Sequence, residues 1–287
     1  MRTFLLSTAL LLSSTLLAQT EVLLSSYPFS DGTHPTAVVT FENAEADAME
    51  SWYKSQLKEA SKDVSNKKEL RASGVRVPEV SQDTITMVCK AEQGKKSPRV
   101  QLHLGYRVNG AWVSSTSAPE LVEGAKKHAY TLAVRYKKEL LTAALETEKK
   151  NKLRLENELA DLVKEKGRAE GSIEKTRQKG VEAGQEKLQA EADLKSNETT
   201  IAAKSAAMGA APTEAQTKEL QDLIKDQGKL KDKIEKEGKA IVDGEKKVKD
   251  LEQEVKDNLA AQASKQSAIE AQAEKEKAAQ KALEEVK

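Results

Sequence analysis

The sequence predicts an α+β protein: a small helix-on-antiparallel-sheet domain, helix-grip-like in layout, followed by a long antiparallel α-helical coiled-coil hairpin. Three observations predict this fold. After residue 20, every aromatic side chain lies between Tyr27 and Tyr136. The remaining chain is rich in Ala, Glu, Lys, Gln and Leu and contains one proline, Pro212, a composition typical of long helices and coiled coils. Within the aromatic region, apolar and polar residues alternate in short segments, as in strands.

The same observations divide the chain into three parts. We expect a signal peptide over residues 1–18, an α+β domain over 19–117 and a coiled-coil helical hairpin over 118–287, with its turn near 207–213. About 100 residues are enough for one modest hydrophobic core.

The N-terminal segment predicts an exported protein. Arg2 supplies a short positive region, residues 4–17 are apolar apart from Ser and Thr, and Ala18 offers a small residue before cleavage at Gln19. The apolar run is too short to cross a bilayer, so we expect a cleaved secretory signal rather than an uncleaved anchor. No later stretch is apolar enough for a membrane helix. We therefore expect the mature chain in the periplasm or outside the cell, without an integral membrane segment.

Charge and cysteine content narrow the classes of function. Charged residues make up 32% of the chain, but 47 Lys and Arg balance 46 Asp and Glu to a net charge of +1. Nucleic-acid binders usually carry a basic excess, so no nucleic-acid partner is expected. Balanced charge instead fits helices laced with opposite charges. Cys89 is the only cysteine, which excludes an intramolecular disulfide, and its strand alternation predicts a buried thiol.

The first elements of the α+β domain are a strand and a helix. Residues 36–42 (TAVVTFE) are typical of a β-strand. Asn43 is a suitable N-cap for a helix that continues to about Ser61, with acidic residues in its first turn. Residues 74–80, interrupted by Pro78, predict a short edge strand or a loop.

Two alternating strands and a return strand complete the domain. Residues 85–91 and 100–108 place apolar side chains on one face each. Asn109–Gly110 predicts a two-residue hairpin, because both turn positions need positive φ. Residues 111–115 then return as the next strand. The expected order is therefore β-α-(β)-β-β-β, followed by a helix.

The long helices begin after residue 116. Ser117–Glu120 (SAPE) has the pattern of a capping box with proline in the first turn. From Leu141 to Ile201, apolar residues recur at alternating steps of four and three, as in a heptad seam with polar interruptions. Residues 208–212 (MGAAP) break this helix, and the short connection makes the next helix an antiparallel neighbour.

The second helix carries a more regular seam than the first. Thr213 caps it, and its seam runs from Leu220 to Val286. Folding the chain about its turn pairs residues whose numbers add to about 421, which sets Ile173 against Val248. Seven glycines in these helices cost about 1 kcal/mol each relative to alanine, so we expect packing to supply the stability. These are Gly167, Gly171, Gly180, Gly184, Gly228, Gly238 and Gly244.

No catalytic constellation can be identified in the sequence. Its three histidines are isolated, and none has metal-ligand spacing with Cys or another His. No nucleophile–base pair or paired catalytic carboxylate stands out among the many charges. We therefore expect a non-enzymatic protein without a metal or a cofactor.

The predicted binding surface is the polar face of the NG hairpin. Arg107 lies directly across from Trp112, and His103 shares their face. A tryptophan there could be a recognition platform for a ligand or peptide, half of a cation–π pair, or core if the helix covers that face. Met208, at the tip of the helical hairpin, is either part of a small-residue loop or a tip that docks into a partner.

Two resemblances carry further expectations. The segments VTFENAEADAMESWYKSQL, SGVRVPEVS and LGYRVNGAWVSS, followed by the Lys/Glu-rich coil, resemble a group of uncharacterised exported bacterial proteins that pair a small α+β domain with a coiled tail. This resemblance covers most of the mature chain and implies no activity. A β-rich body with a helical arm is also similar to periplasmic jellyfish-like holdase chaperones, although this chain has a longer arm and no returning strand.

We therefore expect a structural or interaction protein of the cell envelope that uses its coiled-coil arm as a spacer and docking surface. Its expected partners are proteins, with self-association among the options. The alternatives are a periplasmic holdase-like chaperone, and a ligand- or peptide-binding module on the sheet face around Trp112.

Overall fold

The structure is a computed structural model that describes residues 21–209 and 212–286. The signal peptide expected over 1–18, its cleavage before Gln19 and part of the turn near 207–213 lie outside the described residues. The chain forms two compact units. Unit 1 contains the chain up to Glu148 together with the residues from Glu276 onward, and unit 2 contains Lys149–Lys275.

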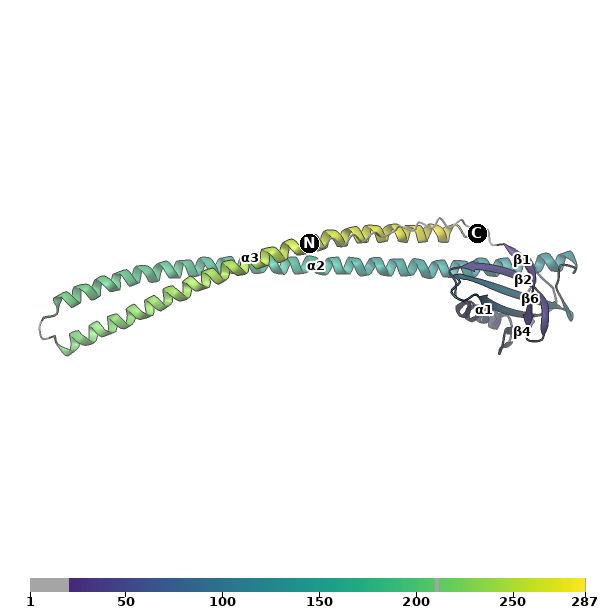
Figure 1. The fold of residues 1–287 in the computed structure, drawn as a ribbon, viewed down its shortest axis with the longest axis horizontal. Coiled ribbons are helices and arrows are strands. Elements are labelled where there is room, and N and C mark those ends of the chain that lie inside the picture. Colours follow the sequence, from purple (N-terminus) through teal and green to yellow (C-terminus); the bar gives the residue numbers. More distant parts are fainter. Residues whose placement is uncertain (1–20, 210–211, 287) are drawn as a thin grey trace. The chain divides into compact units, whose positions relative to one another are not determined.

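Unit 1 is built on one antiparallel sheet, and the predicted α+β class with a long helical hairpin is confirmed (Figure 1). The strand order is β1-β2-β6-β5-β4-β3, and β7 pairs with β6. The strands are β1 (Val22–Phe29), β2 (Gly32–Glu42), β3 (Asp63–Asn66), β4 (Leu70–Val75), β5 (Ile85–Gln93), β6 (Arg99–Val108) and β7 (Ala111–Trp112).

The sheet differs from the sequence prediction at its edges. The predicted core strands correspond to β2, β5 and β6, whereas β1 and β3 were not predicted. Of the two alternatives for 74–80, a short edge strand or a loop, the loop is found over residues 76–80, with Pro78 in a turn. The neighbouring strand, β4, covers Leu70–Val75 and pairs with both β3 and β5. The return strand after Asn109–Gly110 is β7, which is two residues long.

Two helices cover one face of this sheet. Helix α1 (Ala46–Ala60) buries Met49, Tyr53 and Leu57, and the first turns of α2 (Pro119–Ala207) bury residues including Tyr136. Tyr136 packs edge-on against Phe41 of β2, with ring centroids 5.4 Å apart. Cys89 lies in the same core, fully buried, and burial raises the pKa of its thiol well above the ordinary value. The predicted buried thiol is therefore confirmed.

The N-terminus of α1 is stabilised by a side chain other than the predicted one. Asn43 is not the N-cap, because α1 begins at Ala46. Asn43 instead adopts a left-handed φ of 55° and donates its N–H to Pro98 O at 2.7 Å. The side chain of Gln93, at the end of β5, accepts the Ala46 N–H at 3.2 Å. A residue far along the chain thus satisfies a free donor of the helix end.

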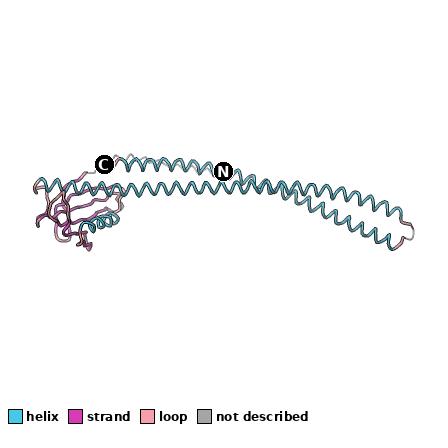
Figure 2. The backbone as a smooth tube through the Cα atoms, turned by 180° about the vertical axis from the view of Figure 1, so that it is seen from behind, coloured by secondary structure: helices cyan, strands magenta, loops and turns pink. Residues whose placement is uncertain are grey.

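Unit 2 is a helical arm made of residues 149–207 of α2 and the part of α3 (Glu214–Glu284) up to residue 275. The two helices run side by side (Figure 2). At 1.5 Å per residue, the α2 stretch from 149 to 207 is roughly 90 Å long. No helix of the described residues is both long and apolar enough to cross a membrane.

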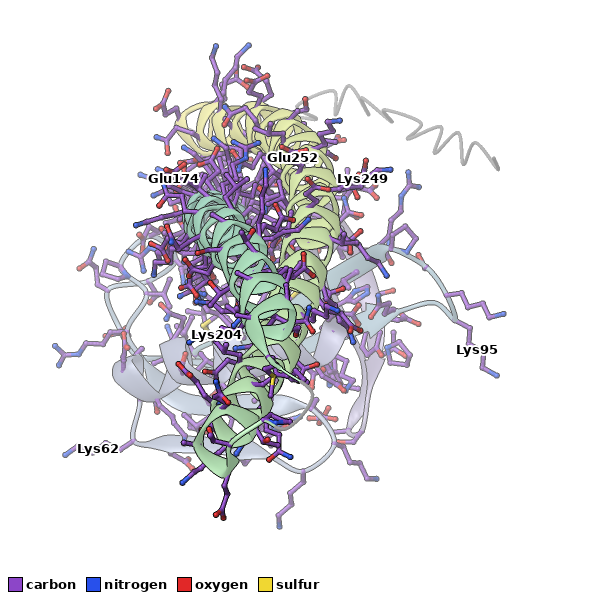
Figure 3. All side chains as sticks on the ribbon, turned by 90° about the vertical axis from the view of Figure 1, so that its left-hand side faces the viewer. Lys62, Lys95, Glu174, Lys204, Lys249 and Glu252 are labelled. Carbon is purple, nitrogen blue, oxygen red and sulfur yellow. The ribbon has the colours of Figure 1, made fainter. Side chains whose placement is uncertain are left out.

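The seam of the arm follows the predicted heptads. Partly buried positions recur every three and four residues on both helices, and Ile173 and Ala190 are among the most buried. A Cβ added at Gly244 would lie 3.8 Å from the Thr176 methyl group, which agrees with the predicted pairing. Cross-helix ion pairs also join Arg177 to Glu252 at 2.6 Å. Charged side chains project outward around the helices (Figure 3).

Candidate functional site

The predicted hairpin residues lie on the sheet face opposite α1 and α2. Register places Arg107 across from Trp112, and the turn between them has the expected positive φ at Asn109 (49°) and Gly110 (85°). We call this surface the aromatic face. It consists of Tyr27 and Phe29 of β1, His34 of β2, His103 of β6 and Trp112 of β7.

Trp112 is part of a stack on this face. Its ring lies 4.2 Å from that of His34, with an interplanar angle of 17°. Gly105 leaves room for the indole, because a Cβ there would come within 3.1 Å of it. Arg107 instead turns back on its own hairpin and donates Nε–H to Gly110 O at 2.9 Å. The aromatic partner of Trp112 is therefore His34, which no local sequence pattern places beside it.

His103 is buried beneath this aromatic layer. It is 6% exposed, and the Tyr27 ring lies 4.4 Å from its own. Burial lowers its pKa below the ordinary value, while the charge of Glu92 opposes that shift, so the imidazole is neutral at physiological pH. The Glu92 carboxylate, 3.6 Å from Nε2, is beyond hydrogen-bond distance.

Two polar side chains on the aromatic face lack hydrogen-bond partners. Within the described residues, neither ring nitrogen of His103 has one, and nor does Oγ1 of Thr36, which is 2% exposed. An unsatisfied buried polar group costs about 1–3 kcal/mol. Such groups call for an explanation, and a bound water or ligand group is the usual one.

The turn between β1 and β2 is fixed across the sheet to β4. The Ser30 hydroxyl donates to Glu69 at 2.6 Å, and Arg71 pairs with Asp31 at 2.8 Å. Although burial alone would raise it, the pKa of Asp31 is lowered by the hydrogen bonds from Arg71 and His34. Since β6 and β5 separate β2 from β4, these bonds show that the sheet curls around the aromatic face.

The tip of the helical arm is described in part. Helix α2 ends at Ala207, and Met208 is partly buried, with its N–H bonded to Lys204 O at 3.2 Å. The adjoining residues 210–211 lie outside the described part. Docking of the tip into a partner stays a prediction.

The helical arm carries most of the exposed apolar side chains. Of the large apolar residues exposed in the described chain, all except Leu23 and Tyr130 lie on it. Each comes one residue after a seam position. The sequence could therefore have identified them as a second set of apolar residues beside the seam. They are Leu153, Val163, Val181, Leu188, Ile224, Val242 and Leu259, between 46% and 67% exposed.

The fold and these surfaces define a class of protein, an α+β domain joined to a two-helix arm. No protein-family model matches the sequence, and no curated protein matches it. Residue roles are therefore assigned from geometry. Within residues 21–209 and 212–286, no three His, Cys, Asp or Glu side chains are grouped to hold a metal ion.

Proposed function

We propose that this chain is an exported, non-enzymatic interaction protein of the cell envelope whose helical arm serves as a spacer and as the docking surface for a protein partner. The observation that carries the proposal is the set of apolar side chains exposed along the arm. Exposed apolar residues scattered singly are ordinary, but these repeat on both helices beside one seam.

The composition of the seam supports the same proposal. Its positions include Gly180, which has no side chain, and Lys152, Lys166 and Lys187, whose charged ends must reach water. Many of its apolar members are small, such as Ala190. Two helices with such a seam leave apolar side chains partly exposed, and an added helix or protein surface can bury them.

The test uses the full chain and two matched variants. The first combines Leu153→Gln, Val163→Gln, Val181→Gln and Leu188→Gln on α2. The control combines Glu156→Gln, Glu165→Gln and Glu174→Gln, which are exposed positions of the same helix. Each variant is cross-linked in native envelope extracts, and circular dichroism checks its helix content.

We expect the wild type and the control to capture one defined partner and the apolar variant to lose it without losing helix. Equal capture by both variants would remove the arm from partner recognition. Suppression of aggregation of many unfolded clients, with no defined partner, would instead support the holdase-like alternative.

A second function, ligand or peptide binding on the aromatic face, is favoured by the unpartnered polar atoms of Thr36 and His103. Trp112→Ala should then abolish binding while the domain stays folded. Arg107→Ala is the matched control, since within residues 21–209 and 212–286 its guanidinium bonds its own turn, at Gly110 O, and no other group. Global unfolding by Trp112→Ala would show that the indole is structural.

A further inference from the structure

A cavity lies on the other face of the sheet, between α1 and the start of α2. Its volume is about 310 Å³, the lower end of the range for small-molecule sites. The end of β4 at Val75 and the segment 76–79 that follows it form a third wall, and Met87 of β5 contributes to the floor. All of these elements belong to unit 1, so the cavity is formed within one compact unit.

Part of the cavity wall is apolar, and polar side chains contribute the rest. Leu57 of α1, Met87 of β5 and Leu132 of α2 line it, and each is 5% exposed or less. Val75 and Val77 extend the same surface on the third wall. An apolar group of a ligand would therefore lose contact with water at this surface, which favours binding by roughly 0.8 kcal/mol per buried methylene.

Neutral hydrogen-bonding groups lie among these apolar side chains. Tyr53, 1% exposed, has the Met87 sulfur 3.8 Å from its hydroxyl, and a thioether is a weak acceptor. His128 Nδ1 lies 3.0 Å from the Tyr106 hydroxyl. Burial lowers the pKa of His128 to about 4, so its ring is uncharged at physiological pH. With Tyr106 as the donor, Nε2 of His128 keeps its proton and can donate to a ligand.

Charges of both signs surround the mouth of the cavity. Arg76 and Arg135 line it with Glu59 and Glu79, and all four side chains are exposed. The charges of Glu79 and Arg135 both act on His128, which places them near the same ring. No ion pair joins any of the four to another described residue, although the chain is rich in such pairs elsewhere. Their charges are thus available to a ligand.

We propose that this cavity binds a small zwitterion with an apolar side chain, of the size and chemistry of a free apolar α-amino acid. The apolar side chain lies against Leu57, Met87 and Leu132. The carboxylate faces the guanidinium of Arg135, and the ammonium faces the carboxylate of Glu79. A simple fatty acid would leave Glu79 beside a second carboxylate, which costs binding energy.

The experiment titrates the full chain with leucine, N-acetylleucine and leucinamide, followed by calorimetry and by NMR shifts of residues around the cavity. Leucine should bind saturably. Removing either charge should weaken binding roughly tenfold or more, because a charge-assisted hydrogen bond is worth about 1.5–3 kcal/mol. Equal binding of N-acetylleucine would overturn the zwitterion in favour of a plain carboxylate. Absence of saturation by leucine at millimolar concentrations would remove the site.

Rim variants separate the two charges. Arg135→Gln should weaken leucine and N-acetylleucine alike, and Glu79→Gln should weaken leucine and leucinamide alike. The control is Glu120→Gln, an exposed position of α2 outside the cavity wall, which should change neither. Because all three residues are exposed, the variants keep the fold, and an unchanged melting temperature checks it. Insensitivity of leucine binding to both rim variants would refute the assignment of its charges.

Discussion

Two glycines of the same helix show how differently the two units are packed. A Cβ at Gly124, in unit 1, would lie 1.9 Å from the carbonyl oxygen of Glu79. A Cβ at Gly171, in unit 2, would have no atom within 4 Å. In unit 1 the backbone of α2 touches the turn after β4, so glycine is required there. In unit 2 no close contact requires glycine at position 171. The stability of the helix there depends on the side chains that pack in its seam.

The largest expected change in stability concerns unit 1, where α2 is packed more tightly. Gly124→Ala should destabilise unit 1 by about 3 kcal/mol or more, because backbone must move to accommodate the methyl group. Both tryptophans lie in unit 1, so tryptophan fluorescence during urea unfolding reports this unit. A midpoint equal to that of the wild type would show that the contact with Glu79 does not exist in solution.

Acid should also destabilise unit 1, which contains the three histidines. The folded pKa of His128, about 4, lies below its ordinary value near 6.5, so the folded state resists protonation. Stability is therefore complete above pH 6.5 and falls as pH decreases to about 4, by roughly 3 kcal/mol. His128→Gln should remove this loss, whereas the contribution of buried His103, whose pKa is also lowered, stays in both proteins.

The measurement is a set of urea melts by tryptophan fluorescence between pH 7 and 4.5. All three histidines belong to unit 1, so the helical signal of unit 2 should change less over this range. An identical pH slope in wild type and His128→Gln would contradict the burial of that ring.

Replacing glycine by alanine in the arm should change stability in the opposite direction. Gly167→Ala and Gly171→Ala should each stabilise the arm by about 1 kcal/mol, since helix propensity improves and nothing crowds the new methyl group. Thermal melts followed at 222 nm report the arm, with unit 1 fluorescence as the internal control. A lower melting temperature for either variant would contradict the open space around that glycine.

The smallest expected change in stability concerns an exposed ion pair of the arm. Arg177→Gln removes the ion pair with Glu252, but both side chains are about half exposed. Exposed pairs contribute about 0.2–1 kcal/mol and are screened by salt. We expect a change below about 0.5 kcal/mol that disappears in 1 M NaCl. A large, salt-independent loss would mean that the pair is buried in an assembled form.

The sequence predicted those parts of the fold whose signals are local. The heptads of the arm, the Asn109–Gly110 turn and the alternation of β5 and β6 depend on neighbours in the chain. The cross-strand register that sets Arg107 opposite Trp112 followed from the turn. Strand β1 was missed because two serines and Pro28 interrupt its pattern, and because among the described strands it pairs with β2 alone.

Features that depend on long-range contacts escaped prediction. His34 stacks on Trp112 only because β1 and β2 lie beside β6 and the sheet curls. Gln93 caps α1 from a distant strand, which displaced the local candidate Asn43. The cavity forms where α1, α2 and the segment 75–79 come together. The periodicity of a sequence does not predict contacts between such distant elements.

Because Cys89 is buried, a cysteine introduced on the surface of this chain can be labelled selectively. Its thiol is fully enclosed and its pKa is raised, so it should not react with maleimides in the native protein. One introduced cysteine, such as Val181→Cys, would then carry the only label. A pair of introduced cysteines would allow the distance between two labels to be measured by spectroscopy. The spacing of the two helices of the arm can be measured in this way without removing Cys89.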